Sequence, residues 1–151
     1  MKYQLFKLNI FVFFKIPSAY ISGVRVASVS AKKVKVRVKH RWINQNPFKS
    51  MYWATQGMAS ELATGLLLMQ AIKASSRKIS MLVICQKGEF VKKATGKIIF
   101  ESIETDVIQN AIQKTLENKE GQKFILYSNG VDEEGEIVSK FEYEWSIKLK
   151  D

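Results

Sequence analysis

Cysteine and histidine are nearly absent from this chain of 151 residues, which contains one of each, Cys85 and His40. A single cysteine cannot form a disulfide framework, so the chain is not a small disulfide-stabilised domain. The two residues are also too few for a dedicated zinc site, and we expect no metal. Because Cys85 lies in an apolar run, we expect a buried structural thiol in a reducing compartment, and therefore a cytoplasmic location.

Long hydrophobic runs are also missing, since a membrane span needs about 20 apolar residues. The first 20 residues have a basic start and an apolar middle, as a signal peptide has, but Lys7 and Asn9 interrupt the run and Lys15 closes it. A helix lying on a membrane surface is one alternative. We prefer a helix that packs on the domain and ends before Pro17, because apolar residues recur at helical spacing at Leu5, Leu8, Phe11 and Val12.

Acidic residues are fewer than basic ones, 14 against 24, which gives a formal net charge of +10. This charge favours an anionic partner such as nucleic acid, acidic lipid, an acidic carrier protein or a phosphate-bearing cofactor. The lysines are spread along the chain without a compact basic tract, so a solvated surface accounts for most of them. No stacking platform or recognition helix is present, and nucleic acid is the least favoured partner. The length and the lack of repeats or linkers predict one domain over residues 1–151.

Alternating apolar residues predict strands on both sides of one long helix. Two strands are expected within residues 24–42, the second with Val34, Val36, Val38, His40 and Trp42 on its apolar face. A second helix should begin at a cap formed by Thr105 or Asp106 and stop at Gly121. The other expected strands are Ile79–Phe90, with a possible bulge at Gly88, then 97–103, 124–127 and, after a turn over 129–135, Ile137–Leu149.

The segment from Ser50 to about Ala74 contains no proline and is predicted to be the long helix. Its second half is apolar nearly all round, which indicates burial. Its middle is rich in small residues, and two glycines inside a helix need a reason, usually the close approach of another backbone. One carboxylate, Glu61, lies among them. A buried charge costs several kcal/mol unless it is paired or protonated. The small residues in the middle of this predicted helix are Ala54, Gly57, Ala59, Ser60, Ala63 and Gly65.

Asn46, Tyr52, Trp53-Ala54 and Glu61 carry a resemblance to a known family. From about Ser22 onward, the chain resembles the hotdog-fold thioesterases, especially the phenylacetyl-CoA and 4-hydroxybenzoyl-CoA thioesterase-like branches. It is most similar to a branch known as a domain of unknown function. The family has Asn or Gln before the helix, His-Gly-Gly at its start, and Asp or Glu two or three turns on. Here Tyr52 takes the His position, Trp53-Ala54 the Gly-Gly positions and Glu61 the acid position, without gaps.

The resemblance implies a hotdog fold, in which a curved antiparallel sheet wraps a long central helix, and hydrolysis of an acyl-CoA or acyl-carrier thioester. It implies that the Trp53 N–H donates to the oxyanion and that Glu61 acts either as general base or as nucleophile. Asn46 would orient a reacting group, or cap its loop. Tyr52 would donate its hydroxyl to the carbonyl, or anchor the subunit contact. Coenzyme A would be part of the substrate, and no other cofactor is expected.

Tyr52 and Glu61 are nine residues apart, so on one helix they point in opposite directions about 13 Å apart. We therefore expect a homodimer or a tetramer, in which Glu61 of one copy meets Tyr52 and Trp53 of another. Other candidate substrate-binding residues are Thr64, Gly65, Lys92, Lys93 and Lys97. The alternative functions are an acyl-binding or interaction module of the same fold without turnover, and a basic binder of nucleic acid or of a membrane surface.

Overall fold

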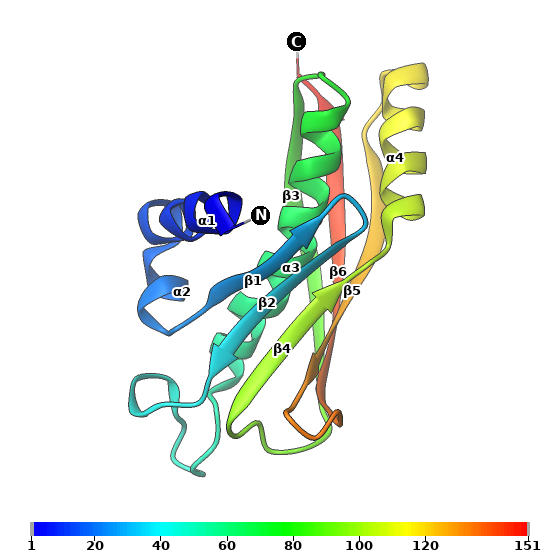
Figure 1. Ribbon diagram of the computed structural model, residues 1–151. Helices are drawn as coiled ribbons and strands as arrows, with labels where there is room; N and C mark the ends of the chain where they lie inside the picture. Colours follow the sequence, from blue (N-terminus) through cyan, green and yellow to red (C-terminus); the bar gives the residue numbers. More distant parts are fainter. Residues whose placement is uncertain (1, 151) are drawn as a thin grey trace.

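The computed structural model describes residues 2–150, and its centre is a six-stranded antiparallel sheet (Figure 1). The sheet curves around one long helix, α3 (Trp53–Ala74), so the predicted α+β layout is confirmed. The strands in spatial order are β1 (Arg25–Ser30), β2 (Lys33–Lys39), β4 (Lys97–Ser102), β5 (Gln122–Val131), β6 (Ile137–Leu149) and β3 (Ile79–Phe90). The other helices are α1 (Lys2–Lys15), α2 (Pro17–Ile21), the 3₁₀ turn η1 (Trp42–Asn44) and α4 (Thr105–Asn118).

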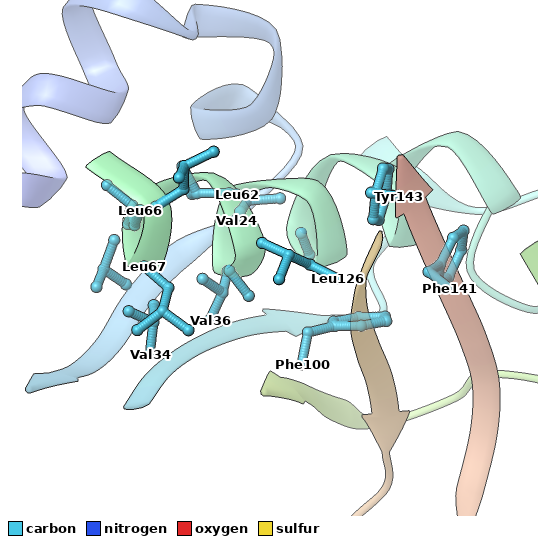
Figure 2. Close-up of a cluster of buried hydrophobic side chains, with 14 of the residues drawn as sticks. Val24, Val34, Val36, Leu62, Leu66, Leu67, Phe100, Leu126, Phe141 and Tyr143 are labelled. Carbon is cyan, nitrogen blue, oxygen red and sulfur yellow. The ribbon is translucent and has the colours of Figure 1, made fainter. Parts of the chain in front are cut away.

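Helix α3 is buried along its second half, as its apolar composition predicts. Leu62, Leu66, Leu67 and Leu68 are at most 4% exposed. Figure 2 shows this part of α3 packed against side chains from several strands: Val34 and Val36 of β2, Phe100 of β4, Leu126 of β5, and Phe141 and Tyr143 of β6.

Strand β6 spans the predicted residues and shows the predicted alternation. Its inward side chains Phe141, Tyr143, Trp145 and Ile147 are 1–3% exposed, while the residues between them are partly or fully exposed. Because β6 pairs with β5 on one side and β3 on the other, this row of aromatic rings lies directly against α3.

The N-terminal helix α1 ends at Lys15, two residues before Pro17. Val12 is fully buried, and Leu5, Leu8 and Phe11 pack beside it. Asn9, the polar residue that interrupts the apolar run, ties α1 to the edge of the sheet: its amide nitrogen donates to the Val26 carbonyl at 3.1 Å, and its oxygen accepts from the Val26 N–H at 3.0 Å. Within residues 2–150, no helix has the length and apolar character that crossing a membrane requires.

The prediction that Trp42 continues the apolar face of the second strand is wrong. Strand β2 ends at Lys39, and Trp42 lies in η1 with 81% of its surface exposed. The cause is the buried side chain of Asn44, whose oxygen accepts from the Arg41 N–H at 2.8 Å and whose nitrogen donates to the Lys39 carbonyl at 2.9 Å. This turn ends the alternation, and His40 is only half-buried.

Two predictions for β3 are also wrong. Cys85 is exposed rather than buried, because β3 is an edge strand that pairs only with β6. The bulge lies between Val83 and Cys85 and not at Gly88. Gly88 has a packing reason instead, since a Cβ there would come within 3.0 Å of the Phe141 ring.

The boundaries of α4 and β5 differ from the sequence predictions. Glu104, not Thr105 or Asp106, occupies the N-cap position of α4, and it makes no side-chain capping bond. The helix ends at Asn118, before Gly121, because Lys119 takes the left-handed conformation. Strand β5 extends from Gln122 to Val131, well beyond the predicted 124–127, and it includes the first residues of the predicted turn.

Candidate active site

The carboxylate of Glu61 is half-buried and has no partner. No residue in 2–150 donates a hydrogen bond to it or forms an ion pair with it. Burial away from water raises the pKa of Glu61 above its ordinary value, because the charged form loses hydration without gaining a compensating contact. A carboxyl group in this state binds a proton more readily than an exposed one.

A pair of hydroxyl groups, from Ser60 directly before Glu61 and from Tyr143, lies at the contact between α3 and β6. The Tyr143 and Ser60 oxygens are 2.6 Å apart, and each lies 3.0 Å from the Gly57 carbonyl. Burial, with a smaller contribution from the charge of Glu61, raises the pKa of Tyr143, so its hydroxyl stays protonated. Tyr143 therefore supplies a neutral polar group next to the acid.

Thr64 and Gly65 lie one turn after Glu61, beneath the indole ring of Trp145. The Trp145 nitrogen donates to the Thr64 hydroxyl at 3.2 Å, and this hydroxyl donates to the Glu61 carbonyl at 3.0 Å. A Cβ on Gly65 would lie 3.4 Å from the indole and 3.7 Å from the Glu61 carboxylate. The close neighbour of this glycine is therefore an aromatic ring, and not a backbone as the sequence suggested.

The start of α3 offers unpaired N–H groups. Tyr52 is the N-cap residue without a side-chain cap, and no acidic residue lies in the first turn. Among the described residues, nothing accepts a hydrogen bond from the N–H groups of Trp53 and Ala54. Such groups, with the helix dipole, stabilise a developing negative charge.

A cleft of about 420 Å³ lies at this helix end and brings together five of the predicted residues. Glu61, Thr64, Gly65 and Lys97 do not line it. Tyr52 and Trp53 are 46% and 52% exposed. The five predicted residues that line the cleft are Asn46, Tyr52, Trp53, Lys92 and Lys93.

Asn46 organises the loop that leads into α3. Its oxygen accepts from the Phe48 N–H at 2.9 Å, and its nitrogen donates to the Ser50 hydroxyl at 3.0 Å. The side chain therefore fixes the loop in this chain, and only a rearrangement or a second copy would free it for a substrate.

The three predicted lysines differ in their partners. Lys92 is surrounded by the carboxylates of Asp132, Glu134 and Glu136. Lys97 pairs with Glu133 at 3.3 Å. Lys93 has no carboxylate partner among the described residues, and it donates to the Phe48 carbonyl at 3.3 Å. Lys93 is therefore the best placed of the three to meet a phosphate.

Sequence reasoning missed Gln56, which also lines the cleft. It is 4% exposed, its nitrogen donates to the Met51 carbonyl at 3.3 Å, and its oxygen has no partner. A buried, unpaired amide oxygen is unusual and suits a donor on a bound molecule. A glutamine inside a helix carries no sequence signal that would have distinguished it.

Comparisons with known proteins agree with this architecture. A family model described as "Domain of unknown function (DUF4442)" matches residues 6–147. No curated protein matches the chain. A protein of unknown function from Pseudomonas aeruginosa, described as a probable thioesterase, is 23% identical with a TM-score of 0.84 over 95% of both chains. A thioesterase candidate from Shewanella oneidensis is 12% identical with a TM-score of 0.80, over 99% of this chain and 100% of that chain.

A more distant match is a thioesterase enzyme from Staphylococcus aureus with a glutamine-to-alanine substitution. It is 10% identical with a TM-score of 0.64, over 83% of this chain and 93% of that chain. The same protein also matches as a glutamate-to-alanine mutant. These likenesses show the fold, which is the hotdog fold predicted from the sequence.

Proposed function

This chain belongs to the DUF4442 family, and on that premise we propose that it hydrolyses acyl thioesters, with acyl-CoA as the substrate class, as a homodimer. The observation that carries the proposal is the half-buried carboxylate of Glu61 without a partner. An unpaired buried acid destabilises a fold, so its presence needs a reason, and carboxyl groups with a raised pKa are common in active sites. The thioesterases among the structural neighbours support the reaction class.

The distance along α3 is the reason to propose a dimer. Glu61 lies eight residues after Trp53, about 12 Å along the axis, and does not line the cleft at the helix start. An antiparallel second copy would bring Glu61 of one α3 to the free N–H groups of the other. Strand β3 offers the contact surface, because it is a sheet edge of 12 residues that carries the exposed side chains of Leu82 and Ile84.

The proposed reaction uses Glu61 and the α3 N-terminus. Glu61 takes a proton from water, the water oxygen bonds to the thioester carbonyl carbon, and the negative charge on the carbonyl oxygen is held by the Trp53 and Ala54 N–H groups of the other copy. When this intermediate collapses, the carbon–sulfur bond breaks and the thiolate takes the proton from Glu61. The products are a carboxylic acid and a free thiol. Direct attack by the carboxylate, through an anhydride, is the alternative route.

Asn46, Tyr52 and Lys93 have supporting roles in this proposal. They line the cleft where the pantetheine arm and phosphates of coenzyme A would lie. In the Staphylococcus aureus protein, the substituted glutamine and glutamate are the same number of positions apart as Asn46 and Glu61. This agreement supports a shared arrangement of an amide before the helix and an acid inside it.

The test is hydrolysis of a panel of acyl-CoAs, followed by release of the free thiol. Glu61→Gln keeps the size of the side chain and removes its basicity, so we expect kcat to fall by about 10²–10⁴-fold. The matched control is Glu120→Gln, which changes an exposed glutamate outside the site. Full activity in Glu61→Gln would remove Glu61 from the mechanism.

A second candidate is an acyl-CoA-binding module without turnover. It is favoured by the bulky rings of Tyr52 and Trp53, whose centroids are 5.8 Å apart at the entrance of the cleft. This function predicts saturable binding of acyl-CoA with no thiol release, and equal binding by Glu61→Gln. The hydrolysis assay therefore distinguishes the two candidates.

A further inference from the structure

Helix α1 is apolar on its outward side as well as on the side that packs against the domain. Phe6, Ile10, Phe13 and Phe14 are 64%, 40%, 47% and 72% exposed. Their spacing places them on one face of the helix, opposite the fully buried Val12. A surface helix normally turns polar residues to water, and a contiguous exposed apolar patch marks an interaction surface.

The outward face of α1 cannot turn inward in this fold. Asn9 holds the helix by two hydrogen bonds to the Val26 backbone, at 3.1 and 3.0 Å, on the edge strand β1. Rotating α1 to bury the phenylalanines would break both bonds and expose Val12. The apolar face is therefore fixed on the outside of the domain.

The positive charge of the chain is concentrated in the part of the sequence that contains this face. Residues 1–60 contain 11 of the 24 lysines and arginines and none of the 14 acidic residues, so the remaining 91 residues have a formal charge of −1. Residues 1–60 form α1, α2, β1, β2, η1 and the start of α3. All 14 acidic residues come after residue 60, and one of them, Glu101 of β4, folds back to pair with Lys33 at 3.3 Å and Lys35 at 3.0 Å.

Further exposed apolar residues lie on the same flank of the molecule. Ile21 at the end of α2 is 64% exposed, and Trp42 and Ile43 of η1 are 81% and 51% exposed. Asn44 joins the two elements by donating to the Ser22 carbonyl at 2.8 Å. Figure 1 shows α1, α2 and the segment between β2 and α3 along one side, and the sheet order puts β1 at the opposite end from β3.

We propose that the outward face of α1 and α2 docks on the surface of an anionic lipid bilayer. The phenylalanines enter the interface between headgroups and acyl chains, and basic residues of the same segment, residues 1–60, meet the lipid phosphates. A partner protein with an apolar groove could also hold such a helix, but the 11 cations and the absence of acids in residues 1–60 favour an anionic lipid surface. The exposed tryptophan suits the same interface. None of these residues lines the cleft at the start of α3, so the inference is independent of thioester hydrolysis.

The test is co-sedimentation of the full chain with vesicles of phosphatidylcholine, alone or with about one-third phosphatidylglycerol. We expect binding to the anionic vesicles that weakens at high salt, and little binding to the neutral ones. The variant Phe6→Gln/Phe14→Gln should reduce the affinity at least about tenfold, because two aromatic side chains no longer leave water on binding. Both residues are exposed, so thermal unfolding should match that of the wild type.

The matched control is Ile125→Gln/Tyr127→Gln, which removes two exposed apolar residues from β5 and should bind vesicles as the wild type does. Three results would overturn the proposal. The first is the absence of binding to anionic vesicles. The second is unchanged binding by Phe6→Gln/Phe14→Gln, which would show attraction by charge alone. The third is a wild-type oligomer in solution that this variant dissociates, which would show that a second copy covers the face.

Discussion

Glu61 is an ionisable residue in an environment that does not stabilise its charge. Its carboxylate is half-buried beside Tyr143 and Gly65, and neither an N–H group nor a cation compensates the charge within residues 2–150. Its ionised form is therefore less stable in the folded chain than in the unfolded chain, and its folded pKa is raised.

This raised pKa predicts how stability depends on pH. Between the ordinary value of 4.5 and the raised folded value, the folded chain binds more protons than the unfolded chain, so Glu61 lowers stability as pH rises. Glu61→Gln should therefore raise Tm at pH 7 and have little effect near pH 4. In a chain of this size, each kcal/mol corresponds to about 2–4 °C.

Thermal unfolding of both proteins at the two pH values measures this effect, and Glu120→Gln is again the control. A loss of stability at pH 7 in Glu61→Gln would contradict this prediction, because it would mean that the carboxylate has a favourable partner beyond residues 2–150, such as one on another copy of the chain.

At the scale of elements, the contact between α3 and β6 distinguishes the two glycines of the helix. Gly65 admits the indole of Trp145, with a Cβ distance of 3.4 Å. Gly57 has more room, since a Cβ there would meet only the Phe141 ring at 4.0 Å. Packing within one chain therefore leaves less room for a larger side chain at Gly65 than at Gly57.

We expect Gly57→Ala to increase the free energy of unfolding by up to about 1 kcal/mol, the difference in helix propensity between the two residues. In Gly65→Ala the same gain is offset by crowding against Trp145 and Glu61. Urea unfolding measures the free energy of unfolding of both variants and tests whether Gly57→Ala is the more stable. Destabilisation by Gly57→Ala would show that a further surface packs closely against that turn of α3.

At the scale of the whole molecule, the unpaired edge of β3 and the incomplete site point to the same requirement. The free N–H groups of α3 and the carboxylate of Glu61 are both present in one chain, but at separate places. An assembly through β3 would pair the open sheet edge and complete the site in one step.

The variant Ile84→Lys should therefore convert the proposed dimer into monomers and reduce thioester hydrolysis at least about tenfold, because a charged side chain on an edge strand opposes pairing. Ile125→Lys is the control, since Ile125 is as exposed as Ile84, at 39%, but lies on β5. Light scattering after size exclusion gives the mass. A monomeric Ile84→Lys with full activity would contradict the composite site.

The sequence by itself determined the elements whose signal is local. Alternation defined β6, and the absence of proline and the apolar surface defined α3. The one carboxylate inside this apolar helix made Glu61 the candidate site residue. These features follow from periodicity and from the cost of burying a charge, which depend only on neighbours along the chain.

Only the tertiary structure decided how distant segments meet. It exposed Cys85 because β3 is a sheet edge, surrounded Lys92 with carboxylates from the β5–β6 turn, and placed the unpaired Gln56 in the cleft. It also fixed α1 through Asn9, so that its phenylalanines face outward. Each outcome depends on sheet order and on contacts between residues far apart in sequence, and no periodic pattern contains that information.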